Sequence, residues 1–154
     1  EAAFEPIGAL IDACKLRSAL ADTMALAREA NRYLDVVAPW LVLKSDRARA
    51  ATATYVALRV IDSLKVLFAP FLPFSSDKLH RALGYDGDLI GQQRVEEYAE
   101  ETRTHTALTC TYEYLGDIWT PSQLAPGQAL RRPEPLFRKL EPEIVAEELA
   151  RLGN

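Results

Sequence analysis

The chain is poor in the residues that most often carry catalysis or bind metals. Its 154 residues include two cysteines and two histidines, and neither Cys14 nor Cys110 has a second Cys or His at the spacing of a zinc site. His80 and His105 have no nearby nucleophile signature, and no glycine-rich loop opens a helix after a strand. We therefore expect no catalytic residue, metal or cofactor within this chain.

Long apolar runs and a secretion signal are also lacking. No stretch of about 18 or more apolar residues occurs, and the first residues lack the basic and apolar segments of a signal peptide. The sequence therefore predicts a cytoplasmic protein with no membrane partner. Hydrophobic residues make up 49% of the chain, which is enough for one core in a single domain spanning 1–154.

Positive charge is in the minority, and the formal net charge is -4. Nonspecific RNA binding depends mostly on Lys and Arg contacts with phosphates, so this balance argues against a general nucleic-acid binder. The charges are unevenly spread, however, because four glutamates between 96 and 101 form what is most simply a solvated face, while several cations precede residue 50. A local basic patch in the first third could therefore still hold a short loop of RNA.

Apolar residues recur at three- and four-residue steps and predict an all-α helical bundle. Pro39 and Pro70 end the two longest helices, and Ser45 is the predicted N-cap of the second. Pro142 is expected at the first position of the last helix. The predicted helices cover about 6–13, 18–37, 46–69, 75–84 and 142–153, with caps at 75–77 and an apolar turn at 70–74.

Glycines and prolines interrupt the helical pattern between about 86 and 140. This segment is therefore predicted to be irregular, with some β structure. The β-branched and aromatic residues from Thr106 to Tyr114 are typical of a strand, for which the sequence shows no evident partner.

The segment from 30 to 40 carries the most specific pattern in the chain. Asn31 and Asp35 lie four residues apart on one helical face, and the helix then ends at Pro39, directly before Trp40. Unpaired bases stack on such aromatic rings with about 1 to 3 kcal/mol per base, while nearby Arg and Asn side chains read base edges. The alternative is that Trp40 seals the end of the bundle against neighbouring apolar side chains.

The residues Ala30-Asn31-Arg32-Tyr33, followed by Ala38-Pro39-Trp40, resemble a signature in the anticodon-binding domain of methionyl-tRNA synthetases. The turn at 67–74 and the tail at 133–140 are similar to two further motifs of that family, and Trp119 resembles its lone late tryptophan. The resemblance covers most of the chain. It implies a helical bundle that binds the anticodon of a tRNA.

The resemblance also implies roles for individual residues. Pro39 and Trp40 are implied to contact the first base of a CAU anticodon. Asn31 and Arg32 are expected either to contact the RNA or to be structural, with Asn31 bonding a neighbouring helix and Arg32 pairing with Asp35 or Asp46. Asp35 is expected to reject wrong anticodons by its negative charge.

The same resemblance implies a parent enzyme, because the family's catalytic domain and the first helix of its bundle are absent from this sequence. The chain is then a fragment of a ligase that attaches methionine to tRNA with ATP and magnesium, and its tail at 133–154 packs back to brace the catalytic domain or to close the bundle. One alternative is a protein-binding helical module that uses Trp40, Phe71 and Phe74 as an apolar hot spot. Another is the same domain of a sister synthetase for isoleucine, valine, leucine or cysteine.

Overall fold

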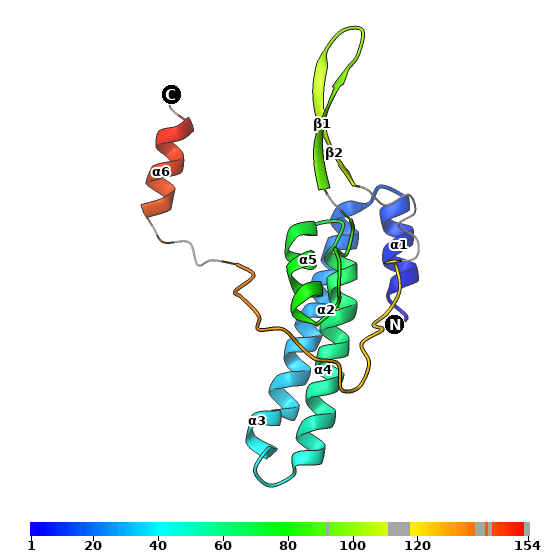
Figure 1. The fold of residues 1–154 in the computed structure, drawn as a ribbon, viewed down its shortest axis with the longest axis vertical. Coiled ribbons are helices and arrows are strands. Elements are labelled where there is room, and N and C mark those ends of the chain that lie inside the picture. Colours follow the sequence, from blue (N-terminus) through cyan, green and yellow to red (C-terminus); the bar gives the residue numbers. More distant parts are fainter. Residues whose placement is uncertain (92, 111–117, 138–140, 142, 153–154) are drawn as a thin grey trace.

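A computed structural model describes residues 1–91, 93–110, 118–137, 141 and 143–152, and most of these residues form a helical bundle (Figure 1). Each long helix packs mainly against the next one along the chain. A two-stranded antiparallel hairpin projects from one end of the bundle. The predicted all-helical bundle with a small β segment is thus confirmed. The elements are α1 (Phe4–Asp12), α2 (Leu16–Val37), α3 (Pro39–Val42), α4 (Arg47–Phe68), α5 (Pro73–Ala82), β1 (Gln93–Ala99), β2 (Thr104–Cys110) and α6 (Glu143–Leu152).

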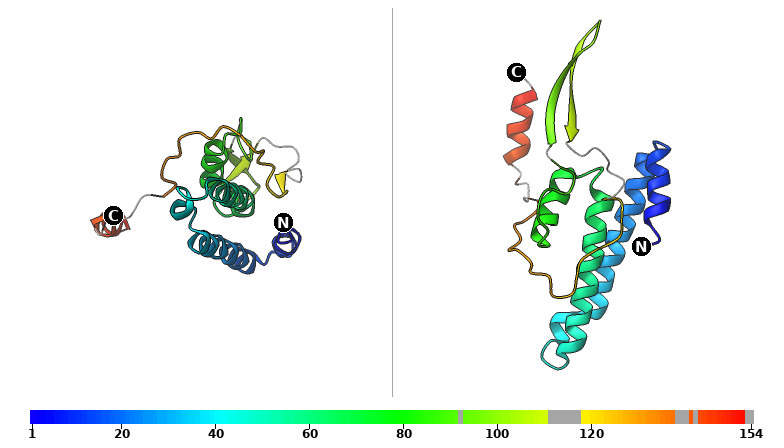
Figure 2. Two further views of the ribbon diagram at one scale, coloured as in Figure 1. Left: turned by 90° about the horizontal axis from the view of Figure 1, so that it is seen from below. Right: turned by 45° about the vertical axis from the view of Figure 1, so that its right-hand side comes forward.

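The core lies where α1, α2 and α4 meet. Viewed along the bundle in Figure 2, α1 and α2 form one layer and α4 and α5 form a second. Ala19 on α2 is fully buried, and its small side chain lets the neighbouring helices approach closely. The buried apolar cluster consists of Phe4, Ile7, Ala19, Val66 and Leu67.

Helices α1, α2 and α5 each begin two residues before their predicted starts, and the N-cap of α4 is not the predicted residue. Asp46, and not Ser45, is the N-cap of α4, because the Asp46 carboxylate accepts a hydrogen bond from the Arg49 N–H at 2.9 Å. The Ser45 hydroxyl instead donates to a carbonyl of the preceding turn. Helix α5 begins at Pro73, before the predicted caps, because a proline at the first helical position needs no N–H partner and has a preset φ.

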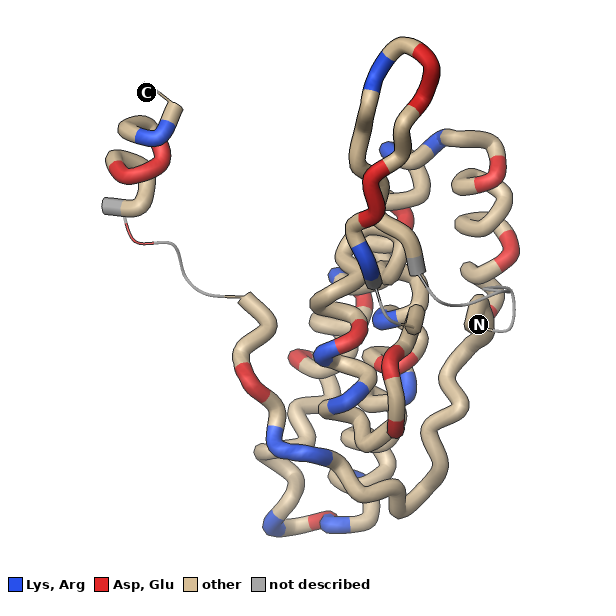
Figure 3. Tube along the Cα trace, turned by 45° about the horizontal axis from the view of Figure 1, so that its top comes forward, with Lys and Arg blue, Asp and Glu red and all other residues tan. Residues whose placement is uncertain are grey.

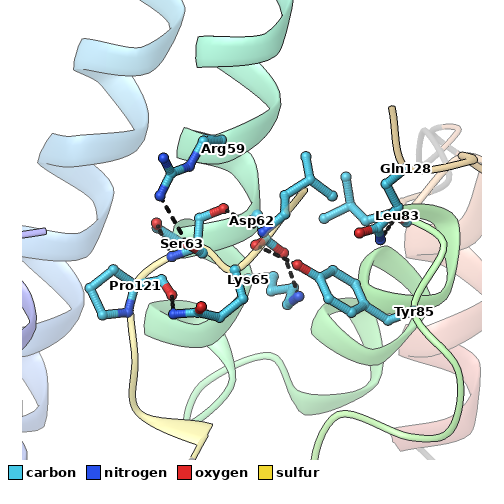
Figure 4. Close-up of polar contacts among 11 residues, drawn as sticks. Arg59, Asp62, Ser63, Lys65, Leu83, Tyr85, Pro121 and Gln128 are labelled. Atoms are coloured by element: carbon cyan, nitrogen blue, oxygen red, sulfur yellow. Dashed lines mark hydrogen bonds and ion pairs between the residues drawn. The ribbon is translucent and has the colours of Figure 1, made fainter. Parts of the chain in front are cut away.

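Residues 118–131, which we call the return segment, run back along the bundle and are tied to it by polar side chains (Figure 4). Arg59 donates to the carbonyl of Ser122 at 3.0 Å, and the Ser122 N–H donates to the Ser63 hydroxyl at 3.0 Å. The Trp119 indole N–H donates to the Phe4 carbonyl, also at 3.0 Å. Two further bonds run from the Tyr55 hydroxyl to the Leu124 carbonyl and from Gln128 to the Leu83 carbonyl.

A buried ion pair joins Asp62 and Lys65 on α4 and reaches Tyr85, which follows α5 (Figure 4). The Tyr85 hydroxyl donates to Asp62 at 2.9 Å, and the Lys65 ammonium lies 3.8 Å from the centre of the Tyr85 ring. Burial lowers the pKa of Lys65, and the adjacent carboxylate opposes that effect. Burial and the bond to Asp62 raise the pKa of the Tyr85 hydroxyl. The cluster therefore fixes the end of α5 against α4 through charge and hydrogen bonds.

The predicted strand corresponds to β2, which starts at Thr104, and residues 111–114 of that prediction lie outside the described part of the chain. Its partner is β1, with Val95 opposite Leu108 in the register. The glutamates of β1, Glu96 and Glu97, are both exposed, but they point to opposite faces of the hairpin and so do not form the single solvated face that was predicted.

The described residues of the tail, 133–137, 141 and 143–152, do not close the core of the bundle. The Phe137 side chain is 65% exposed, and the apolar side chains Val145 and Leu149 of α6 are also exposed. Pro142, expected to open this helix, lies outside the described residues, and α6 is observed from Glu143. None of the helices in the described ranges is long and apolar enough to cross a membrane.

Candidate nucleic-acid interface

The predicted site residues lie at or near one end of the bundle, where α2 turns through α3 into α4. We call this end the tip. Ala38 caps α2 in the left-handed conformation, with φ 39° and ψ 63°, and its N–H donates to the Leu34 carbonyl at 2.8 Å. This conformation costs a residue with a side chain about 1 to 2 kcal/mol. Pro39 comes next, is buried, and disfavours helical angles at Ala38, so the chain must turn at this point.

Trp40 points away from the bundle core. Its side chain is 59% exposed, and the neighbouring Leu41 is more exposed still, so Trp40 does not seal the bundle end. The buried Pro39 on one side and the packing of α3 against α4 hold the backbone that carries Trp40. The geometry therefore offers an accessible indole face on a fixed backbone, as base stacking requires.

The three predicted site residues on α2 are all exposed: Asn31, Arg32 and Asp35. They lie about 3 to 9 Å along the helix axis from Val37, the last residue of α2. Arg32 pairs with Glu29 at 2.5 Å, so the predicted pairing with Asp35 or Asp46 is wrong. The i, i+3 spacing places Glu29 on the turn directly preceding Arg32. Hydrogen bonding to Arg32 lowers the pKa of Glu29, but both groups are open to solvent and the pair is readily exchanged for another partner.

The side chain of Asn31 makes no hydrogen bond within the described residues, which argues against the predicted bond to a neighbouring helix. Asn31 is one of the residues that line an apolar groove between α2 and α4. The groove has a volume of about 630 Å³, and Leu26, Leu34, Val60 and Leu64 are among its lining residues.

Three cations lie at the tip, in the loop after α3 and in the first turn of α4. Lys44 precedes α4, and Arg47 and Arg49 belong to its first turn; all three are exposed and form no ion pair within the described ranges. Figure 3 shows blue segments at the loop where α3 leads into α4. Despite the acidic overall balance, the tip therefore offers local positive charge to a phosphate backbone.

Arg28 is a further candidate that is not among the site residues predicted from the sequence. It precedes Asn31 by three residues, Arg32 by four and Asp35 by seven, so all four residues share one exposed face of α2. Arg28 has no ion pair in the described part of the chain. The helical spacing alone could have identified it.

Phe71 and Phe74 are remote from the tip, because α4 separates them from Trp40. Its 22 residues correspond to about 33 Å. Phe71 packs against the buried core, while Phe74 is exposed. The single apolar hot spot considered for a protein-binding module is therefore not formed.

The sequence matches the family described as the anticodon binding domain of methionyl tRNA ligase over residues 2–109. Three similar proteins are methionine–tRNA ligases from Roseiflexus sp. (strain RS-1), Chloroflexus aurantiacus and Thermomicrobium roseum. They are 52%, 50% and 48% identical to the chain over 97%, 97% and 98% of its length.

These alignments cover 26%, 25% and 26% of the respective ligases, so the chain spans about a quarter of the length of the relatives it matches. The family match covers more than half of the chain and includes the whole tip. The chain belongs to the family of methionyl-tRNA ligase anticodon-binding domains.

Proposed function

We propose that the tip binds the CAU anticodon loop of a methionine-specific tRNA. Trp40 stacks on the first anticodon base, and Pro39 holds the turn that presents it. Asn31 and Arg32 contact the RNA from α2, and the three cations of the tip meet its phosphates. The observation that carries the proposal is the exposure of Trp40 at a conformationally restricted turn in a chain of this family.

Asp35 would act in this proposal by repulsion. Its carboxylate is exposed between the turn of Arg28 and the tip, and it forms no ion pair within the described residues. A misplaced phosphate would approach a negative charge there, which lowers the affinity for wrong loops more than for the correct one. Asp35→Asn should therefore tighten binding of loops with an altered first base while leaving CAU binding nearly unchanged.

The parent protein is, in the same proposal, a cytoplasmic ligase that attaches methionine to tRNA using ATP and magnesium. Its catalytic domain is a partner of this chain within one polypeptide, and residues 133–154 reach back toward it. The apolar groove between α2 and α4 receives the expected first helix of the bundle. Its apolar lining, with Leu26 and Leu64 among the contributors, supports a helix as its occupant.

The test is a fluorescence titration with anticodon stem-loops that carry CAU or one altered first base. Salt must be held at one physiological concentration, because phosphate contacts alone produce salt-dependent affinity. We expect a preference for CAU that Trp40→Ala removes, at a cost of about 1 to 3 kcal/mol. Val36→Ala, at another exposed apolar residue near the tip, is the matched control and should keep the preference.

Equal weak binding of every loop, unchanged by Trp40→Ala in a folded protein, would contradict the stacking role. Circular dichroism of each variant establishes that the helices are intact. A loss of binding in both Trp40→Ala and Val36→Ala would also count against a specific role for the indole ring.

A further inference from the structure

The β1–β2 hairpin is a prominent feature that anticodon binding does not use. It projects from the end of the bundle opposite the tip (Figures 1 and 2). Its strands pack chiefly on each other, with no extensive helix contact. An isolated two-stranded hairpin is marginally stable in water and normally needs another strand or a helix on one face. A covering surface is therefore expected.

The two faces of the hairpin differ in how well their side chains are satisfied. On one face the Tyr98 hydroxyl donates to Glu96 at 3.0 Å, and the Tyr98 ring stacks on His105 with 5.9 Å between ring centres. We call the other side the open face. Its members, taken from the strand register, are Val95, Glu97, Ala99, Thr104, Thr106 and Leu108.

The open face combines an apolar pair with an unpaired carboxylate. Val95 and Leu108 lie directly opposite each other and are 72% and 55% exposed. Glu97 follows Val95 on the same face and has neither an ion pair nor a side-chain hydrogen bond within the described residues. The complementary group is an Arg or Lys whose aliphatic stem covers the apolar pair while its charged head meets Glu97.

Charge argues against three other occupants of the open face. Glu97 on the open face, together with the three other glutamates between 96 and 101 close to it in sequence, would repel the phosphates of RNA. Helix α6 has exposed apolar side chains, but it is itself acidic, and its Arg151 is already paired with Glu148 at 2.8 Å. A second copy of the chain would bring the same glutamates against one another.

We propose that the open face docks on an Arg- or Lys-bearing helix of the same polypeptide, outside residues 1–154. This inference rests on the proposed function, in which the chain is part of a longer ligase. The chain spans only about a quarter of the relatives it matches, so ample polypeptide remains to supply the helix. An anticodon and the amino-acid acceptor lie at opposite ends of a tRNA, so a catalytic part lies toward the hairpin if the tip holds the anticodon.

The test compares amide hydrogen exchange in residues 93–110 between the full-length parent protein and the chain 1–154. We expect the amides of β1 and β2 that are hydrogen-bonded across the hairpin to exchange at least tenfold more slowly in the full-length protein, because packing on the open face makes opening of the hairpin rarer. Glu97→Lys should abolish this protection. Glu101→Lys makes the same charge change in the turn between the strands, off the open face, and should keep it.

Equal exchange in both proteins, or full protection in the Glu97→Lys protein, would overturn the docking. Protection that appears in the chain 1–154 only as its concentration rises would assign the open face to a second copy and overturn it as well. CAU loop binding by the chain 1–154 should be unaffected by Glu97→Lys. The two proposals can therefore fail separately. If Trp40→Ala leaves loop binding unchanged while the hairpin amides stay protected in the full-length protein, anticodon binding by Trp40 is refuted and the docking is not.

Discussion

Replacing Lys65 by methionine removes the cation from the buried pair with Asp62 and keeps a side chain of similar length. The side chains of Lys65 and Asp62 are only 5% and 2% exposed. Removing one partner of a buried ion pair usually costs about 3 to 5 kcal/mol, because the remaining charge loses its counter-ion. Hydrogen bonds from Tyr85 and Ser122 to Asp62 remain, so we expect a loss near the lower end, about 3 kcal/mol at pH 7.

The loss of stability should depend on pH. Burial would raise the pKa of Asp62, but hydrogen bonds led by that from Lys65 outweigh burial and hold the pKa below its ordinary value. A carboxyl group whose pKa is lower in the folded than in the unfolded protein stabilises the folded state at pH values above its pKa in the unfolded protein. This stabilisation is lost as the pH falls through its pKa in the folded protein. Without Lys65, burial should dominate and raise the pKa of Asp62. As the pH falls toward about 4, Asp62 becomes protonated in the Lys65→Met protein and its unpaired charge disappears. The loss of unfolding free energy caused by Lys65→Met should therefore shrink.

The assay is urea unfolding at pH 7 and at pH 5, followed by circular dichroism. Lys44→Met is the matched control, since Lys44 is exposed and has no ion pair within the described residues. The double variant Asp62→Leu with Lys65→Met should be less destabilised than Lys65→Met alone, because no unpaired charge remains. A loss below about 1 kcal/mol for Lys65→Met, or an equal loss at both pH values, would refute the reasoning.

Substitutions at two further positions, Ala38 and Gly84, test backbone geometry, with urea unfolding and limited proteolysis as the measurements. Ala38→Gly should leave stability unchanged or raise it by up to about 1 kcal/mol, because glycine adopts the positive φ freely, whereas the β-branched Ala38→Val should lower it by about 2 kcal/mol. Gly84→Ala should destabilise the domain by about 2 kcal/mol and expose the return segment to protease, since its Cβ would lie 2.1 Å from the Ala129 carbonyl oxygen at a φ of 89°. A stable Ala38→Val protein, or a protease-resistant Gly84→Ala protein, would contradict these expectations.

The helices were predictable because their apolar spacing and proline stops are local signals. On α4, for example, the regularly spaced Ala53, Ala57 and Leu67 are all buried. The start of α5 was misplaced because Ser75 and Ser76 are good capping residues, yet Pro73 two to three positions earlier already suits the first helical turn. Competing local signals of similar strength could not be ranked without the surrounding packing.

The long-range pairings were not predictable from local pattern. Strand β1 contains glutamates, which are uncommon in strands, and only the register with β2 identifies it. In the site, the exposure of Trp40 could not follow from periodicity, since the same spacing suits a buried residue. The partner of Arg32 was also missed, because Glu29 and Asp35 are both within reach on a helix and only the rotamer decides between them.

The order in which the helices pack has a consequence for how the domain forms during synthesis. Helix α1 packs on α2, α2 packs on α4, and α4 packs on α5. The two helices of each pair are close in sequence, so they can pack together soon after the later one leaves the ribosome. The bonds of the return segment close much longer loops, of which the 115-residue separation between Phe4 and Trp119 is an example. Trp119 therefore reaches its place after the helices have paired, and its fluorescence should report the last step of folding.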